Sequence, residues 1–140
     1  MRLGVATAAL LLFSGCAIKN HQYGSSLEGV AKDLDGQASV TVYRPGIIGM
    51  AVKYPVTVND QPTPALRANT FVTTAVDAGP VRVQAKGEVV CTITFDAKPD
   101  HAYAFRAKNK MGWLYARVQL DAATAAEERE FKAQCIRVPE

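Results

Sequence analysis

Residues 80–86, Pro-Val-Arg-Val-Gln-Ala-Lys, decide the fold class, because apolar and polar side chains alternate strictly along them. Apolar residues stand at positions 81, 83 and 85, and polar residues stand at positions 82, 84 and 86. A period of two residues with one polar face is typical of a half-buried antiparallel strand. The segment therefore predicts a protein built mainly from β-strands.

The same alternation recurs on both sides of this segment, from Ala38 to Leu120. Turn-forming residues such as Arg44-Pro45-Gly46 and Lys98-Pro99-Asp100 separate the alternating stretches. Short strands at this spacing predict a small antiparallel β-sandwich of about seven strands. The expected strands are residues 38–43, 52–58, 69–76, 80–86, 88–95, 101–108 and 113–120.

A helix is expected to close the sandwich after the last of these strands. Asp121 or Thr124 would cap the helix, and Thr124 with Glu127 three residues later has the spacing of a capping box. Ile136 and Val138 then alternate as a final short strand. The folded domain is therefore predicted to span residues 38–140.

The beginning of the chain has the pattern of a secretion signal. Arg2 precedes an apolar run from Val5 to Phe13, which is too short to remain as a membrane span and predicts a cleavable signal peptide over residues 1–15. Ser14 and Gly15 then lead into a cysteine.

The small residues before Cys16 resemble the lipobox of bacterial lipoproteins. The resemblance implies that the Cys16 thiol receives a diacylglyceryl group and that Cys16 becomes the mature N-terminus, carrying palmitate-type acyl chains. The alternative is ordinary signal cleavage after Ala17. Because Ala17 stands where an aspartate would favour inner-membrane retention, the resemblance implies an outer-membrane anchor that faces the periplasm.

Residues 16–37 are polar and rich in glycine and serine, which predicts a flexible tether. A linker of about twenty such residues spans roughly 25 Å on average. Removal of residues 1–15 takes away Arg2 and leaves 15 basic against 13 acidic side chains. A charge this close to balance argues against a nucleic-acid partner, because nucleic-acid binders concentrate basic residues on one surface.

Two cysteines, Cys91 and Cys135, remain if Cys16 carries lipid. In an oxidising periplasm they predict a disulfide, which would close a loop of about 44 residues and stabilise the fold by at most about 4 kcal/mol. The alternative is that both are buried and unpaired, since Cys91 shares its strand parity with Ile93 and Phe95.

The last two predicted strands suggest a hairpin closed by a four-residue loop at 109–112. Tyr103 would then lie opposite Val118, and Arg106 opposite Tyr115. The polar side of this hairpin would carry a stripe suited to cation–π contacts and to anionic or sugar-bearing partners. The alternative is that the C-terminal helix covers the stripe. The predicted partner-binding residues are Arg106, Lys108, Trp113, Tyr115 and Arg117.

Motifs of the common enzyme classes, such as G-x-S-x-G, H-E-x-x-H and phosphate-binding glycine loops, are absent from the sequence. His101 and Asp96 are weak metal-ligand candidates at a turn, and a solvated loop histidine is the simpler interpretation. We therefore expect no catalytic residue, no metal site and no cofactor.

A family resemblance covers residues 38–120. Val40-Thr41-Val42-Tyr43-Arg44-Pro45-Gly46 and Ala102-Tyr103-Ala104-Phe105-Arg106 resemble the "YRP" lipoprotein domains of bacteria, which are small β-sandwiches. Gly79-Pro80 departs from the Pro-Gly order of that pattern. The resemblance implies a fold and a location in the cell envelope, and it implies no activity.

Two functions agree with these features. The first is a lipid-anchored periplasmic module that binds an envelope protein or a glycan as a non-catalytic scaffold. The second is an inhibitor or immunity protein that blocks a wall-degrading enzyme, for which the apolar loop Gly46–Met50 is the candidate plug. The alternative for this loop, and the interpretation that the sequence favours, is burial in a corner of the sandwich.

Overall fold

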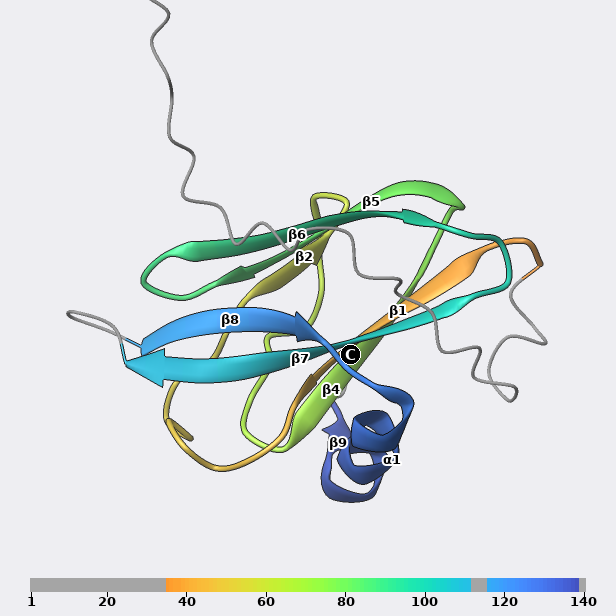
Figure 1. Ribbon diagram of the computed structural model, residues 1–140. Helices are drawn as coiled ribbons and strands as arrows, with labels where there is room; N and C mark the ends of the chain where they lie inside the picture. Colours follow the sequence, from red (N-terminus) through yellow and green to blue (C-terminus); the bar gives the residue numbers. More distant parts are fainter. Residues whose placement is uncertain (1–34, 112–115, 139–140) are drawn as a thin grey trace, which may run out of the picture.

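The sandwich is confirmed by the computed structural model, which describes residues 35–111 and 116–138 (Figure 1). Within these residues one sheet has the strand order β8-β7-β1-β4-β9 and the other has the order β3-β2-β5-β6. A helix, α1, packs on the outer side of the five-stranded sheet. The elements are β1 (Ala38–Arg44), β2 (Val56–Val58), β3 (Gln61–Pro62), β4 (Thr70–Val76), β5 (Gly79–Lys86), β6 (Val90–Ala97), β7 (Ala102–Met111), β8 (Ala116–Ala122), α1 (Ala125–Gln134) and β9 (Ile136–Arg137).

Most neighbouring strands are antiparallel, and two pairs are parallel. β1 runs parallel to β7, and β4 runs parallel to β9. The predicted strand at 52–58 is shorter than expected, because only residues 56–58 pair with β5. Tyr54 forms an isolated bridge to Leu66, and the intervening Pro55 has no N–H group with which to extend a ladder.

The main core lies between the two sheets and is built from the apolar side of each alternating strand. β1 is buried along its whole length. Neighbouring strands flank it on both edges, the main core covers one of its faces, and α1 covers the other. Phe95 contacts Tyr103 and Phe105 with ring centroids 4.7 and 5.4 Å apart. The buried core includes Val40, Val42, Val56, Val81, Val83, Ile93, Phe105 and Leu120.

The predicted capping box is confirmed at the start of α1. The Thr124 side chain accepts a hydrogen bond from the Glu127 N–H, and the Glu127 carboxylate accepts one from the Thr124 N–H. The helix buries Glu128, which accepts a hydrogen bond of 3.0 Å from the Tyr43 hydroxyl. Burial, followed by the nearby Glu128 charge, raises the pKa of Tyr43, so this phenol stays neutral.

The predicted register of the last hairpin is wrong by six residues. Phe105 pairs with Ala122, and Lys110 pairs with Arg117, because β7 continues as far as Met111. Asn109 is therefore a strand residue rather than a turn residue. A shift by an even number preserves which side chains face the core, so Phe105 is buried as expected.

The expected disulfide is also wrong, since Cys91 and Cys135 are not bonded to each other. Cys91 lies in the main core, where its sulfur accepts a hydrogen bond of 3.4 Å from the Leu120 N–H. Cys135 lies in a second cluster with Tyr43 and Phe131, beneath α1. The five-stranded sheet stands between the two cysteines, and burial raises the pKa of the Cys135 thiol.

The chain enters the sandwich beside the turn between β6 and β7. The Gly36 N–H donates to the Asp100 carboxylate at 3.0 Å, and the Gln37 amide donates to Asp77 at 3.1 Å. The end of the predicted tether is thus held against the domain at residues 36 and 37. Cys16 and the predicted signal peptide lie outside the described residues.

Candidate functional site

The predicted aromatic and basic stripe is only partly within the described structure. Trp113 and Tyr115 lie outside the described residues. Arg106 is covered by α1, with its guanidinium carbon 5.6 Å from the centre of the Phe131 ring, which matches the alternative of a covering helix.

The other two basic residues of the stripe have acidic neighbours. The Lys108 amine lies 3.9 Å from an oxygen of Asp121, and the Arg117 guanidinium lies 3.4 Å from Glu88. Both cations are nearly half exposed, so these ion pairs contribute little to stability. The described part of the stripe therefore offers no continuous open surface.

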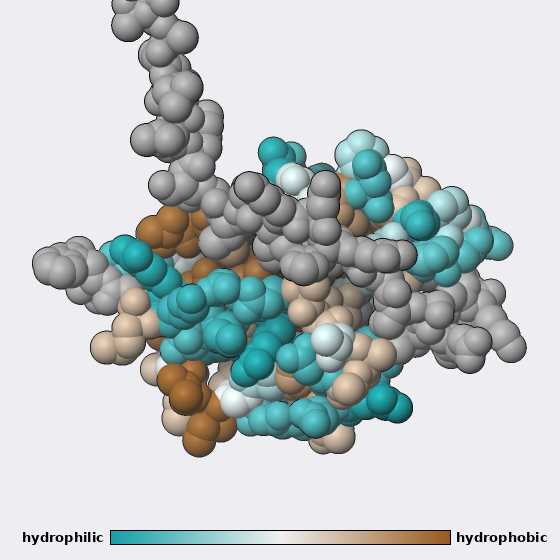
Figure 2. Space-filling view, viewed as in Figure 1, coloured by the Kyte–Doolittle hydropathy of each residue, from teal (hydrophilic) through white to brown (hydrophobic). Residues whose placement is uncertain are grey.

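The loop between β1 and β2 is exposed, which corrects the burial that the sequence favours. Ile47, Ile48 and Met50 are 64%, 80% and 69% exposed. Figure 2 shows a brown apolar patch at the lower left, where Figure 1 places this loop. Because large apolar side chains on a solvent-facing loop gain nothing from folding, a patch of this kind is a candidate interaction surface.

Arg44 holds the base of this loop from the inside. Its side chain is 2% exposed, and its guanidinium donates hydrogen bonds to three backbone carbonyls, those of Gly49, Val52 and Leu66, at 2.8, 2.5 and 3.1 Å. The guanidinium carbon also lies 4.5 Å from the centre of the Tyr54 ring. Burial lowers the pKa of Arg44 from its usual high value.

The planar fork of an arginine presents five N–H donors in a fixed, spread geometry, whereas a lysine has three donors on a single nitrogen. This buried cation therefore ties together three backbone carbonyls from both sides of the loop; those of Gly49 and Leu66 also accept from the N–H groups of Val52 and Tyr54. One sequence signal of this role is the position of Arg44 between the end of a strand and Pro45-Gly46. An arginine beside Pro-Gly has the pattern of a turn residue, and this pattern does not reveal that Arg44 is buried beneath the loop.

A second set of contacts joins the loop to β7. The Asn109 side chain donates to the Ile48 carbonyl at 3.3 Å and accepts from the Tyr54 hydroxyl. A Cβ atom on Gly49 would lie 2.3 Å from the Asn109 amide nitrogen, and Gly49 also has φ of +69°. A side chain at position 49 would therefore be strained and would displace the Asn109 amide, so glycine suits this position.

Two other apolar loop tips lie at the same end of the sandwich. Val89 and Val90 are 50% and 42% exposed at the turn between β5 and β6, and Met111 is 97% exposed at the end of β7. The Glu88 N–H donates to the Ala116 carbonyl at 3.1 Å, and Ala116 pairs with Met111, which places these tips together. We name this surface the loop end; it consists of Ile47, Ile48, Met50, Val89, Val90 and Met111.

Each tip of the loop end adjoins an exposed lysine. Lys53 follows the β1–β2 loop, Lys86 precedes the β5–β6 turn, and Lys110 precedes Met111. Among the ten acidic residues that the structure describes, Glu88 alone lies at this end, where it pairs with Arg117. The loop end therefore combines aliphatic tips with a positive rim.

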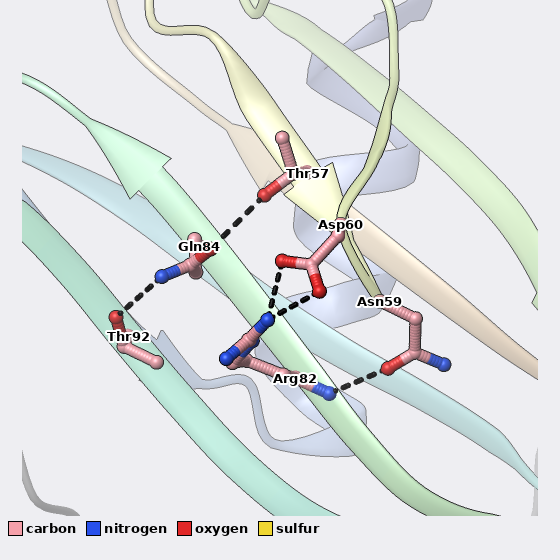
Figure 3. A network of polar contacts seen from close by, with 6 residues as sticks. All are labelled: Thr57, Asn59, Asp60, Arg82, Gln84 and Thr92. Carbon is pink, nitrogen blue, oxygen red and sulfur yellow. Dashed lines mark hydrogen bonds and ion pairs between the residues drawn. The ribbon is translucent and has the colours of Figure 1, made fainter.

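The outer face of the four-stranded sheet is polar and internally bonded (Figure 3). Gln84 links Thr57 and Thr92 across three strands at 3.4 and 3.2 Å. Arg82 forms an ion pair with Asp60. Because these side chains satisfy one another, this face is a solvated sheet surface rather than a candidate site.

Among the described residues, no group of three or more His, Cys, Asp and Glu side chains is placed to hold a metal ion. His101 points its Nδ1 atom at the Pro99 carbonyl, 2.8 Å away. The described helix is too short and too polar to cross a bilayer.

Comparison with known protein families, with curated proteins and with solved structures finds no match to this chain. The resemblance to YRP-type lipoprotein domains therefore stays a prediction. The loop end, defined by exposure and geometry, is the candidate functional site.

Proposed function

We propose that this chain is a lipid-anchored module of the bacterial cell envelope that faces the periplasm and acts by binding through its loop end. Cys16 supplies the anchor, as the lipobox resemblance implies, and the β-sandwich supplies a rigid scaffold. The observation that carries the proposal is the exposed apolar loop Ile47–Met50 on a base fixed by Arg44. A preorganised surface binds more tightly because little conformational entropy is lost on association.

The rigid loop also supports the second candidate, an inhibitor or immunity protein against a wall-degrading enzyme. Ile47 and Ile48 project from a loop whose backbone is bonded to Asn109 as well as to Arg44. An inhibitor needs a projecting segment of fixed shape that enters the cleft of its target, and such loops change little on binding. The two candidates share the same surface and differ in what occupies it.

Site-specific photocrosslinking in intact cells tests the proposal. A photoreactive amino acid at position 48 should capture a neighbouring molecule when cells are irradiated, because Ile48 is 80% exposed on the loop end. The control is the same amino acid at position 61, since Gln61 is exposed on the short edge strand β3. Mass spectrometry of the captured species separates a scaffold partner from a wall-degrading enzyme.

We expect a discrete crosslinked product from position 48 and none from position 61. Products of equal yield from both positions, or none from position 48, would contradict binding through the loop end.

A further inference from the structure

We infer that the partner of the loop end is an anionic lipid bilayer, into which the aliphatic tips insert while the surrounding lysines contact the headgroups. This inference rests on the proposed function, because it names the partner of the same surface. It is a second membrane contact, made by the folded domain and separate from the proposed lipid anchor at Cys16.

The chemistry of the tips favours hydrocarbon over a protein partner. Among the residues that the structure describes, the exposed apolar side chains of the loop end are isoleucine, valine and methionine, which offer no directed polar contact. Binding hot spots between proteins are instead enriched in tryptophan, tyrosine and arginine. Aliphatic tips on three separate loops suit a fluid surface, because each can insert without a matching pocket.

The charges around the tips complement anionic headgroups. Lys53, Lys86 and Lys110 are exposed beside the three tips, and Glu88, the described acidic residue at this end, is only 18% exposed in its side chain and pairs with Arg117. A lysine stem can lie along the apolar boundary while its amine reaches the phosphates. A basic residue near an anionic surface favours binding by about fivefold.

The position of the loop end also leaves it accessible. Gly36 and Gln37 are held at the start of β1, beside Asp100 and Asp77, whereas the loop end follows the last residue of β1. The seven residues of β1 separate these two ends by about 23 Å. The acidic residues Asp77 and Asp100 thus lie at the end of the sandwich away from the inserted tips.

Tryptophan fluorescence in vesicles tests the inference with the acylated full-length protein. Ile48→Trp in a Trp113→Phe background places the chain's single indole on the loop end. The protein is reconstituted into vesicles that contain lipids brominated on the acyl chain, which quench an indole at the depth of the hydrocarbon. Gln61→Trp in the same background is the control, and Met50→Trp is a second position on the loop if Ile48→Trp does not fold.

We expect quenching from position 48 in vesicles that contain phosphatidylglycerol, and little from position 61. Replacing both Lys53 and Lys110 with Gln should lower the ratio of inserted to free loop by roughly 25-fold, since each lysine contributes about fivefold. The same substitutions should weaken the dependence on phosphatidylglycerol, with Lys86 left as the remaining lysine of the rim.

The inference would be overturned if position 48 were quenched as strongly in vesicles of phosphatidylcholine alone as in vesicles that contain phosphatidylglycerol. It would also be overturned if position 48 were quenched in neither. If photocrosslinking at position 48 then captures a protein, the proposed function stands with a different partner. If neither quenching nor a crosslink is found, both the inference and the proposed function fail.

Discussion

Replacing Arg44 with Met is expected to destabilise the fold by about 2–4 kcal/mol, which lowers the melting temperature by roughly 10–20 °C for a domain of this size. The reason is that methionine fills much of the space but donates no hydrogen bond. The carbonyls of Gly49, Val52 and Leu66 then lose the guanidinium donor at the base of the loop, and that of Val52 is left without a described donor. Thermal unfolding followed by circular dichroism measures the effect.

The matched control is Arg82→Met, because Arg82 is an exposed arginine whose ion pair with Asp60 lies on the sheet surface. Its loss should change stability by less than about 1 kcal/mol. Arg44→Lys should recover only part of the stability, since one ammonium group cannot bond all three carbonyls in the geometry of the fork. An Arg44→Met chain as stable as the Arg82→Met chain would show that Arg44 does not organise the loop.

Replacing Cys16 with Ser is expected to abolish acylation completely, because a hydroxyl does not take the place of the thiol that accepts the diacylglyceryl group. Each buried methylene of an acyl chain contributes about 0.8 kcal/mol, so two or more chains hold a protein at a membrane essentially permanently. Metabolic labelling with an alkyne analogue of palmitate measures acylation of the wild-type and the Cys16→Ser proteins. The wild-type chain should carry the label, and the Cys16→Ser chain should carry none.

The mass of the mature N-terminal peptide gives an independent result for the wild-type chain. The proposal expects a peptide that begins at Cys16 with attached acyl chains. A mature chain that begins at Ile18 without lipid would instead establish ordinary cleavage after Ala17, and it would remove the anchor from the proposed function.

The strands could be predicted from the sequence because burial of one face of a sheet imposes a period of two residues. The stretch 80–86 has this period, and it lies within β5 as expected. The capping box at Thr124 was equally predictable, because its contacts are local in the sequence. These features depend on neighbours along the chain.

The register of β7 against β8 could not be predicted in the same way. Asparagine is common in turns, but the Asn109 side chain bonds to Ile48 and Tyr54, which are more than fifty residues away in the sequence. These contacts fix Asn109 within β7, which continues to Met111. Long-range contacts thus override the local preference of an asparagine for turns.

The sequence points to the loop Gly46–Met50 as a candidate plug, but it favours burial of that loop, for a related reason. An apolar run such as Ile47–Met50 predicts burial unless another group supports the loop from below. Arg44 provides that support through backbone carbonyls, and no sequence pattern marks a carbonyl as an acceptor. The exposure of the loop is therefore visible only once the structure places Arg44 beneath it.

Thiol labelling in intact cells tests most directly whether the loop end is occupied. Ile48→Cys and Gln61→Cys chains are treated with a maleimide, in cells and after purification, and the labelling rates are compared. Cys91 and Cys135 are buried, and the proposed acyl group blocks Cys16, so the introduced thiol dominates the signal. If the loop end is nine-tenths occupied, position 48 should react about tenfold more slowly in cells than in the purified protein, while position 61 should react at the same rate in both. Equal rates at position 48 in cells and in the purified protein would contradict binding through the loop end.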